Sequence, residues 1–459
     1  MPRRLQPGAL AAFVFLFGLL ACSDQNTTAP PLGDNSTADV ADPTLDTLVP
    51  VVRQLAAQHG VTPLERPATP RVPLVVLGQA LAFDKLLSGN RDIACMTCHL
   101  PDFATGDGRS LSVGQGGSGL GPARAHPQGH FIGRNAPPLF NLSQMTSFFW
   151  DGRVSRGSDG ALHLPERVEL TEAQAGALEF GALSAQGLIP LLSRSEMRGE
   201  SGNELADIPD DRPAEVWEAI MRRIRDVPAY RGLFTAAYPG QRFEDMTIAH
   251  ASNAIAAFFV ARLSFTDTPW DRFLRGDDRA LDSAQLRGAR NFLAFTCVKC
   301  HSGPALSDNG FHNALVPQFG PGAGHGADGR DDFGRMGVTN NAAERYAFRT
   351  PPLRNVELTS PYGHNGAIKD LRAFVDHYSE IDAKLRSFNP ADLEPLLQGT
   401  LLPTTEAILA TRDPLLGTTK LADARIDETT AFLKALTDPA ARELRKLRPT
   451  RVPSGLPVD

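Results

Sequence analysis

The sequence predicts a mainly α-helical protein made of two related, tandem domains with long loops and little β-structure. Two segments about 200 residues apart share one pattern of residues, which indicates a duplicated unit. Apolar residues recur at helical spacing, as at Leu286, Ala289, Phe292 and Leu293, while strand-like alternation is scarce. The 459 residues are about three times the ~150 typical of one domain, so each half can bury its own core.

Composition narrows the class of protein further. Hydrophobic residues make up 42% of the chain and charged residues 21%, which excludes a largely disordered chain and a multi-span membrane protein. The net charge of −6 provides no basic field, and we expect no nucleic-acid partner. The five cysteines are an odd number, and they are too few to stabilise a fold of this size through disulfides.

The first of these cysteines follows an export signal. An apolar run of 14 residues from Gly8 to Ala21 comes after two arginines, and it is too short to span a membrane comfortably. The run ends in Leu-Leu-Ala-Cys, which looks like a lipobox with Cys22 as the lipidated residue. The alternative is an ordinary signal peptide that is cut near Ala21. We expect residues 1–21 to be a lipoprotein signal peptide.

The residues after Cys22 have the composition of a linker. Residues 22–66 are rich in Ser, Thr, Asp, Pro and Ala and lack helical periodicity, so we expect a flexible tether there. The folded part is then exported to the periplasmic side, where acyl chains on Cys22 form its only attachment to the membrane.

The other four cysteines form two C-x-x-C-H motifs, the attachment signature of c-type haem. In this signature the two thiols bind the porphyrin covalently and the adjacent histidine is the proximal ligand of the iron. A redox disulfide or a shared zinc site would leave the histidine after each pair unexplained. The sequence therefore predicts two covalent haem c groups and two haem irons at Cys95, Cys98, His99, Cys297, Cys300 and His301.

The segments around the motifs repeat. Residues 77–83 before the first motif resemble residues 287–293 before the second, where Asp282 and Gln285 are spaced like a capping box. A helix-like segment at 247–263 separates the two units, and a last amphipathic helix stops at Pro439. We expect two cytochrome c-like haem domains, an N-terminal one at 67–266 and a C-terminal one at 267–459.

Between and after the motifs lie further stretches that resemble the bacterial dihaem cytochrome c peroxidase and MauG superfamily. The resemblance covers about residues 74–437. It is carried by the two haem motifs together with Phe149-Trp150-Asp151-Gly152-Arg153, Gly133-Arg134-Asn135-Ala136-Pro137, Ser195-Glu196-Met197, Leu353-Arg354-Asn355-Val356 and Pro361-Tyr362-Gly363-His364-Asn365-Gly366.

The resemblance implies a role for each matching residue. The N-terminal haem, with His99 as proximal ligand, is implied to react with peroxide. Glu196 matches the distal acid, which moves a proton between the peroxide oxygens, and Pro190 matches a residue of the same pocket. Trp150 matches the aromatic residue that passes electrons between the haems. Asn135, Thr359 and Pro361 match an inter-domain calcium site, the last two through backbone carbonyls.

Two positions depart from the peroxidase members of that superfamily. The usual methionine ligand of the second haem is missing, because Met336 is the last methionine, and Tyr378 stands at the matching position. A stripe with Leu371, Phe374 and Val375 points Tyr378 inward and leaves His377 about 100° away. Tyrosine ligation there is the MauG-type feature. The alternatives are a core tyrosine beside a five-coordinate haem, or ligation by Met336 or His377.

The other departure is at the first haem. Peroxidases of the family carry a distal histidine 16 residues after the proximal one, and here that residue is Gln115, a poor iron ligand. The first site is then open without reductive activation, unless His126 or His130 from the longer following loop reaches the iron. The long segments 157–187 and 320–334 receive no assignment.

These residues together predict a dihaem c-type oxidoreductase that reduces hydrogen peroxide at the N-terminal haem with electrons relayed from the C-terminal haem. Its electron donor is expected to be a small cytochrome c or a cupredoxin. The alternative is a MauG-like enzyme that oxidises Trp or Tyr of a partner protein through a bis-ferryl state. A non-catalytic dihaem electron carrier is the alternative of another class. Homodimerisation is common in the family, so the resemblance implies a homodimer.

Overall fold

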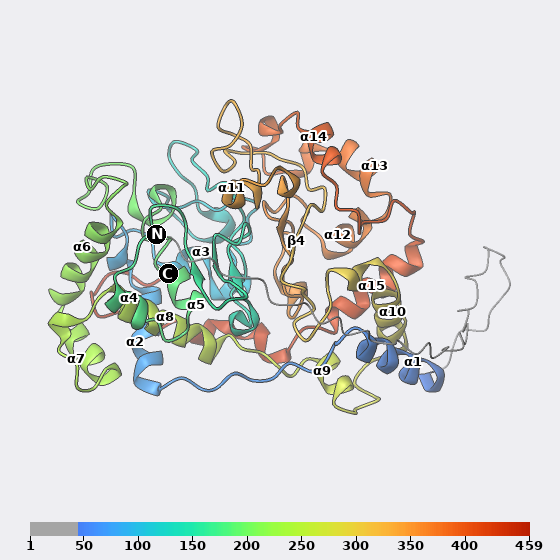
Figure 1. Cartoon of the computed structure of the whole chain (residues 1–459), viewed down its shortest axis with the longest axis horizontal. Helices are drawn as coiled ribbons and strands as arrows, with labels where there is room; N and C mark the ends of the chain where they lie inside the picture. The colour runs from blue at the N-terminus through green and yellow to red at the C-terminus, as the bar shows by residue number, and fades with distance from the viewer. Residues whose placement is uncertain (1–44) are drawn as a thin grey trace, which may run out of the picture. The chain divides into compact units, whose positions relative to one another are not determined.

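The computed structural model describes residues 45–459 and is mainly helical (Figure 1). The expected signal peptide, Cys22 and the first part of the expected tether lie outside the described residues. The longer helices are α1 (Leu45–Gln58), α2 (Val72–Phe83), α6 (Pro213–Arg225), α7 (Pro228–Ala237), α8 (Ile248–Arg262), α10 (Ser283–Ala294) and α15 (Asp423–Lys434).

Shorter helices carry much of the loop structure. They are α3 (Cys95–Cys98), α4 (Glu172–Gly176), α5 (Ala182–Gln186), α9 (Pro269–Leu274), α11 (Met336–Thr339), α12 (Leu371–His377), α13 (Ile381–Arg386) and α14 (Thr405–Ala410), with single 3₁₀ turns between them. The mainly helical fold class is confirmed.

The β-structure consists of two small antiparallel sheets. The strands β1 (Ser147–Phe148), β2 (Val154–Arg156) and β3 (Leu162–His163) form one sheet in that order. The strands β4 (Phe311–His312) and β5 (Phe348–Arg349) form the other, with Phe311 opposite Arg349. The second sheet belongs to the C-terminal half of the chain, yet β5 contacts the first functional site, as described below.

A helix before each haem motif packs against a later helix with close backbone contact. In the first half α2 crosses α8, and a Cβ atom on Gly78 would lie 1.7 Å from the carbonyl oxygen of Ala254. In the second half α10 crosses α15, and a Cβ atom on Gly288 would lie 1.9 Å from the carbonyl oxygen of Glu428. Both helices therefore need glycine at the crossing, and the repeat seen in the sequence is a structural repeat.

The predicted helix signals agree with the structure. The segment expected at 247–263 is α8, which is buried along nearly its whole length. Asp282 and Gln285 form the predicted capping box at the start of α10, since the Gln285 backbone N–H donates to the Asp282 carboxylate over 2.8 Å. The last amphipathic helix is α15, with Ile426, Thr429 and Leu433 buried.

Residues 45–66, which were expected to belong to the tether, are instead part of the folded structure. Helix α1 packs beside α10 (Figure 1), and Leu48, Val52 and Ala56 are buried in the core of the second half. The spacing of these three residues is helical, although Pro50 interrupts the stretch and the segment that precedes it is polar.

The other end of the chain packs on the first half. Ala441, Leu444 and Val452 join the core that surrounds α2 and α8. The Ser454 hydroxyl donates to the buried carboxylate of Asp84 over 2.6 Å. Each half of the chain is therefore completed by a terminal segment from the other end, and the described residues 45–459 form one compact unit.

Candidate active site

The first C-x-x-C-H motif is held by the short helix α3 and the tight turn after it. The Nδ1–H of His99 donates to the carbonyl oxygen of Thr105 over 2.9 Å. Burial lowers the pKa of His99, so the imidazole is neutral. A neutral imidazole that donates its other N–H to a backbone carbonyl is the usual form of a histidine that binds iron.

The second motif has the same arrangement. The Nδ1–H of His301 donates to the carbonyl oxygen of Leu306 over 2.9 Å, and burial lowers the pKa of His301. Thr105 and Leu306 both have positive φ, at +65° and +53°, so each motif is followed by a left-handed residue whose carbonyl turns back toward the histidine. The residues at both motifs therefore fit a covalently attached haem.

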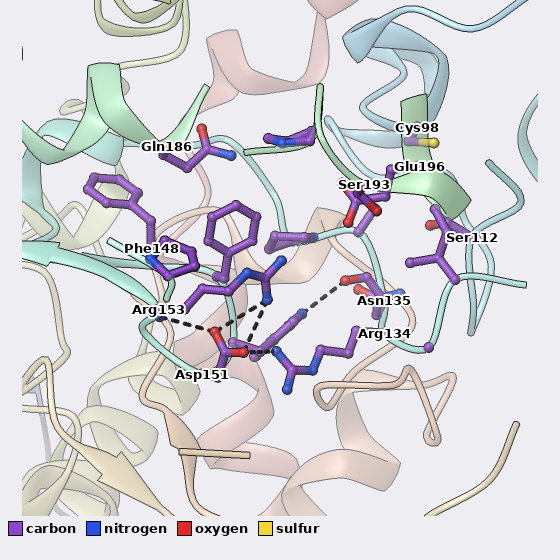
Figure 2. A pocket seen from close by; sticks show the side chains of 18 of the residues that line it. Cys98, Ser112, Arg134, Asn135, Phe148, Asp151, Arg153, Gln186, Ser193 and Glu196 are labelled. Atoms are coloured by element: carbon purple, nitrogen blue, oxygen red, sulfur yellow. Dashed lines mark hydrogen bonds and ion pairs between the residues drawn. The ribbon is translucent and has the colours of Figure 1, made fainter. Parts of the chain in front are cut away.

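A cavity of about 710 Å³ opens beside the first motif (Figure 2). Its wall includes many of the residues that the sequence singled out from distant parts of the chain. They are Cys95, Cys98, His99, Asn135, Trp150, Pro190 and Glu196.

Glu196 lies on a single π-helical turn, Arg194–Arg198, and borders the cavity on the same side as Cys98 (Figure 2). The turn is held by the backbone N–H of Gln115, which donates to the carbonyl oxygen of Glu196 over 2.9 Å. Burial raises the pKa of Glu196, and the positive charge of Arg153 opposes that rise only in part. The carboxyl can therefore both take up and release a proton near the cavity.

Trp150 is held from both halves of the chain. Its indole Nε1–H donates to the carbonyl oxygen of Asn135 over 2.9 Å, and its own carbonyl accepts the backbone N–H of Arg349 over 2.8 Å. The side chain is 8% exposed and borders the cavity. An aromatic ring fixed in this way has one orientation, which suits an electron path better than a mobile ring.

Four charged side chains from both halves of the chain form a network at the cavity. Arg134 binds both carboxylate oxygens of Asp332 at 2.7 and 2.8 Å and one oxygen of Asp151 at 2.5 Å. Arg153 binds Asp151 from the other side over 3.1 Å. Although burial raises the pKa of Asp151, Arg134 and then Arg153 lower it well below its ordinary value. The network ties the first half, through Arg134, to Asp332 of the second half.

Gln115, His126 and His130 do not border this cavity. The Gln115 side-chain oxygen lies beside Gly199, the residue that follows the π-helical turn. The rings of His126 and His130 stack on each other with centroids 4.5 Å apart, and His130 is exposed. Neither histidine is among the residues that border the cavity, so the structure gives no support to their ligation of the first haem.

The two long segments without an assignment both contribute to the cavity. Leu164, Pro165 and Glu166 border it from the segment 157–187, and His325 borders it from the segment 320–334. The second segment lies against the first half so closely that a Cβ atom on Gly133 would be 1.7 Å from the carbonyl oxygen of Gly322. No pattern in the sequence marks these residues, since they meet only in the folded chain.

At the second motif, Tyr378 is the C-cap residue of α12. Burial raises its pKa, and so do the thiols of Cys297 and Cys300, which lie close enough for their charge to be felt. Within the part of the chain that the structure describes, the Tyr378 hydroxyl forms no hydrogen bond, unlike the hydroxyls of Tyr346 and Tyr362. A phenol without a partner beside the attachment cysteines fits an axial ligand of the haem.

The alternative ligands are engaged or placed elsewhere. The Nε2–H of His377 donates to the carbonyl oxygen of Ala314 over 2.9 Å, and its ring stacks on Phe374. Met336 begins α11, whose next residues Gly337 and Val338 border the cavity at the first motif. The structure therefore favours Tyr378 over both.

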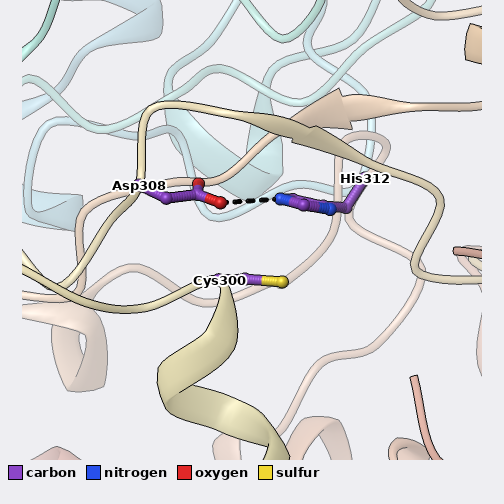
Figure 3. Close-up of side chains that lie close together, drawn as sticks. All are labelled: Cys300, Asp308 and His312. Carbon is purple, nitrogen blue, oxygen red and sulfur yellow. Dashed lines mark hydrogen bonds and ion pairs between the residues drawn. The ribbon is translucent and has the colours of Figure 1, made fainter. Parts of the chain in front are cut away.

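A cluster beside Cys300 has the composition of a metal site but does not fit one (Figure 3). Potential ligand atoms of Cys300, Asp308 and His312 lie within 4.8 Å of one another. The hydrogen bond to Asp308, together with those to Cys300 and Asp413, raises the pKa of His312 to about 11. The imidazolium has both nitrogens engaged, at 2.8 Å from Asp308 and 2.6 Å from Asp413, while Cys300 is a haem-attachment residue.

The residues expected to bind calcium lie in two neighbouring loops. The backbone N–H of Asn135 donates to the carbonyl oxygen of His364 over 2.9 Å, which joins its loop to the one that holds Pro361. The side-chain N–H groups of Asn135 point to the carbonyls of Arg109 and Ser110, so Oδ1 is its free ligand atom.

Comparison with known proteins agrees with these features. Residues 73–279 match the family model described as di-haem cytochrome c peroxidase. The chain is 31% identical over 320 residues to the methylamine utilization protein MauG of Methylorubrum extorquens, covering 69% of this chain and 70% of that protein. It is 30% identical over 325 residues to the cytochrome c peroxidase Ccp of Escherichia coli, covering 70% of this chain and 56% of that one.

Two solved structures have a similar fold. A MauG-like protein associated with microbial copper homeostasis has a TM-score of 0.57 at 23% identity, covering 85% of this chain and 97% of that one. The diheme peroxidase BthA from Burkholderia thailandensis has a TM-score of 0.53 at 20% identity, covering 83% and 91%. None of the helices among residues 45–459 is both long and apolar enough to cross a membrane.

Proposed function

The chain belongs to the dihaem cytochrome c peroxidase family and is a peroxidase-type oxidoreductase; we propose that it reduces hydrogen peroxide at the first motif, with electrons relayed from the second. One observation carries this proposal: Glu196, Trp150 and the attachment residues Cys95, Cys98 and His99 border one cavity. The haem bound there supplies the iron at which the peroxide O–O bond is cleaved.

Glu196 performs the proton transfer in this proposal. Reduction of one peroxide to two waters consumes two electrons and two protons, and one peroxide oxygen must lose a proton before the other leaves as water. A carboxyl with a raised pKa takes the first proton and returns it to the departing oxygen. Pro190 borders the same cavity and limits the room beside Glu196.

Trp150 and Tyr378 are proposed to serve electron transfer between the haems. Trp150 lies on the wall of the first cavity and is bonded to β5 of the second half, so it is placed to pass electrons between the halves. Tyr378 is proposed as an axial ligand at the second motif. A phenolate ligand stabilises the oxidised iron, so the second haem would have a low midpoint potential.

A MauG-like oxidation of Trp or Tyr on a partner protein is the second candidate. The observation that favours it is the free hydroxyl of Tyr378 beside Cys297 and Cys300. Gln115, in place of a distal histidine, supports the same candidate because no side chain must leave before peroxide binds. A non-catalytic electron carrier is less well supported. Electron transfer alone requires neither a cavity beside the haem nor a proton-transferring carboxyl such as Glu196.

Further properties are proposed with the function. The protein is exported and is held at the membrane by lipid on Cys22. A calcium ion binds Asn135 together with the carbonyls of Thr359 and Pro361. The electron donor is a small cytochrome c or a cupredoxin, and two copies associate as a dimer.

The experiment that tests the proposal measures hydrogen peroxide turnover with a reduced small cytochrome c. Glu196→Gln should lower kcat by about 10²–10⁴-fold, which is the usual contribution of general acid–base catalysis. Glu166→Gln is the matched control, because Glu166 borders the same cavity but is exposed. Equal turnover by Glu196→Gln and the unmodified protein would refute the assignment of Glu196.

A further inference from the structure

Arg349 is a buried cation at the wall of the first cavity. It is the second residue of β5 and is only 4% exposed, yet it borders the cavity that the first motif faces. Its guanidinium donates to two backbone carbonyls, those of Phe149 at 3.2 Å and Thr350 at 3.3 Å. No carboxylate lies within ion-pair distance of it among residues 45–459.

The neighbouring arginines of the cavity differ in this respect. Arg134 is neutralised by Asp332 and Asp151, and Arg153 is neutralised by Asp151. Both oxygens of Asp151 are already engaged by these two arginines. Arg349 therefore has no carboxylate of its own, although it is more deeply buried than Arg153.

A buried charge without a counter-charge is unfavourable. Burial lowers the pKa of Arg349 to about 10, and the charge of Asp151 offsets this only in part. The side chain nevertheless stays protonated at neutral pH. A buried charge is unfavourable unless it is paired and hydrogen-bonded. We therefore expect an anion in the cavity to pair with the Arg349 guanidinium.

We infer that Arg349 binds a carboxylate of the haem attached at Cys95 and Cys98. The porphyrin of haem c carries two propionate groups, and the cavity that holds it is the space that Arg349 borders. Hydrogen peroxide is neutral and cannot supply the missing charge. A planar guanidinium is well matched to a carboxylate. The second half of the chain thereby contributes a residue to the first haem site.

The same residue is bonded to Trp150. The Arg349 backbone N–H donates to the Trp150 carbonyl, and its side chain donates to the carbonyl of Phe149. A contact between Arg349 and a propionate would therefore fix one edge of the first haem relative to the indole ring. Arg349 is in this sense a positioning residue for electron transfer between the halves, and its charge also favours the reduced haem.

The test measures the midpoint potential of each haem, and the propionate bending band by resonance Raman, in the holoprotein. Arg349→Gln should shift the first haem to lower potential and move the propionate band, because it keeps a hydrogen-bond donor and removes the charge. Arg349→Lys keeps the charge, so its first-haem midpoint potential should stay close to that of the unmodified protein. Arg335→Gln is the matched control, since Arg335 also donates to two backbone carbonyls but does not border the cavity.

Two results would overturn the inference. One is a folded, fully haem-loaded Arg349→Gln protein whose first-haem potential and propionate band both equal those of the unmodified protein. The other is a shift of the first-haem spectrum when chloride or acetate is added to the unmodified protein, lost in Arg349→Gln, which would show that an external anion occupies the site. If the glutamine variant does not fold, the same two measurements are made on Arg349→Met, where an unmoved first-haem potential together with an unmoved propionate band is equally decisive against the inference.

Discussion

The backbone N–H of Arg349 donates a hydrogen bond to the carbonyl oxygen of Trp150 over 2.8 Å, and so joins the strand β5 of the second half to the wall of the first cavity. The Trp150 indole is held at its other end by Asn135. Because both anchors are backbone carbonyl or N–H groups, the ring position is set by the fold and survives most side-chain substitutions nearby.

Replacing Trp150 should therefore slow electron transfer between the haems and leave the fold intact. In Trp150→Phe the indole N–H is lost and the ring is smaller, so we expect a lower rate of peroxide turnover with cytochrome c. Stopped-flow reoxidation of the pre-reduced second haem by peroxide measures the step directly. Trp217→Phe is the control, because Trp217 is buried in the core and donates to Leu188 away from the cavity. Equal slowing in both variants would contradict a special role for Trp150.

Tyr378→Phe should change the absorption and electron paramagnetic resonance spectra of the second haem only. Removal of the hydroxyl takes away the proposed axial ligand, while the ring still packs against Phe374. Tyr378→Met should raise the potential of the second haem, since a His/Met ligand pair favours the reduced iron. Tyr362→Phe serves as the control, because its hydroxyl is engaged by the carbonyl of Val356. Unchanged spectra in Tyr378→Phe would show that another residue is the ligand.

The pH dependence of stability gives a test of Glu196 that does not use activity. Burial raises its pKa in the folded protein above the unfolded value of about 4.3. The folded state then binds the proton more tightly than the unfolded state. Below about pH 4 Glu196 is protonated in both states and does not lower the free energy of unfolding. As the pH rises through the folded pKa, deprotonation of Glu196 lowers the free energy of unfolding. Glu196→Gln should match the unmodified protein in free energy of unfolding at low pH and exceed it at pH 8. A difference that is constant with pH would contradict the raised pKa.

The glycines at the two helix crossings predict a matched pair of stability effects. Gly78→Ala and Gly288→Ala each place a Cβ atom less than 2 Å from a carbonyl oxygen of the partner helix. We expect each to destabilise the protein by about 1–3 kcal/mol or more, as overpacking does. Gly232→Ala in α7 meets no atom within 4 Å and should be neutral or slightly stabilising. Chemical denaturation of the three variants measures the differences.

Some parts of the fold and site could be predicted from local patterns. The haem motifs and the capping box at Asp282 depend on residues close together in sequence, and they lie where the patterns placed them. The stripe that ends at Tyr378 is only partly right, because His377, which the helical spacing turns away from the stripe, is buried while Tyr378 is partly buried. The repeat was also detectable, because Gly78 and Gly288 occupy equivalent helices that make the same close contact.

Other parts depend on contacts between distant residues, which no local pattern reveals. Helix α1 packs its stripe at Leu48, Val52 and Ala56 against the core of the second half, beside α10, and this contact spans more than 200 residues of sequence. No local pattern marks Arg349 as a cavity residue, and its place on the wall of the first cavity follows from the position of β5. The engagement of His377 by Ala314 likewise spans 63 residues.

The most direct test of the central claim is to add one equivalent of hydrogen peroxide to the fully oxidised holoprotein and follow the Soret bands of both haems by stopped flow. The account predicts a fast change in the unmodified protein without prior reduction, because Gln115 leaves the first site open. It predicts the same change, slowed at least tenfold, in Glu196→Gln. An unmodified protein whose spectrum does not respond to peroxide, in either the oxidised or the half-reduced state, would contradict peroxide chemistry at this site.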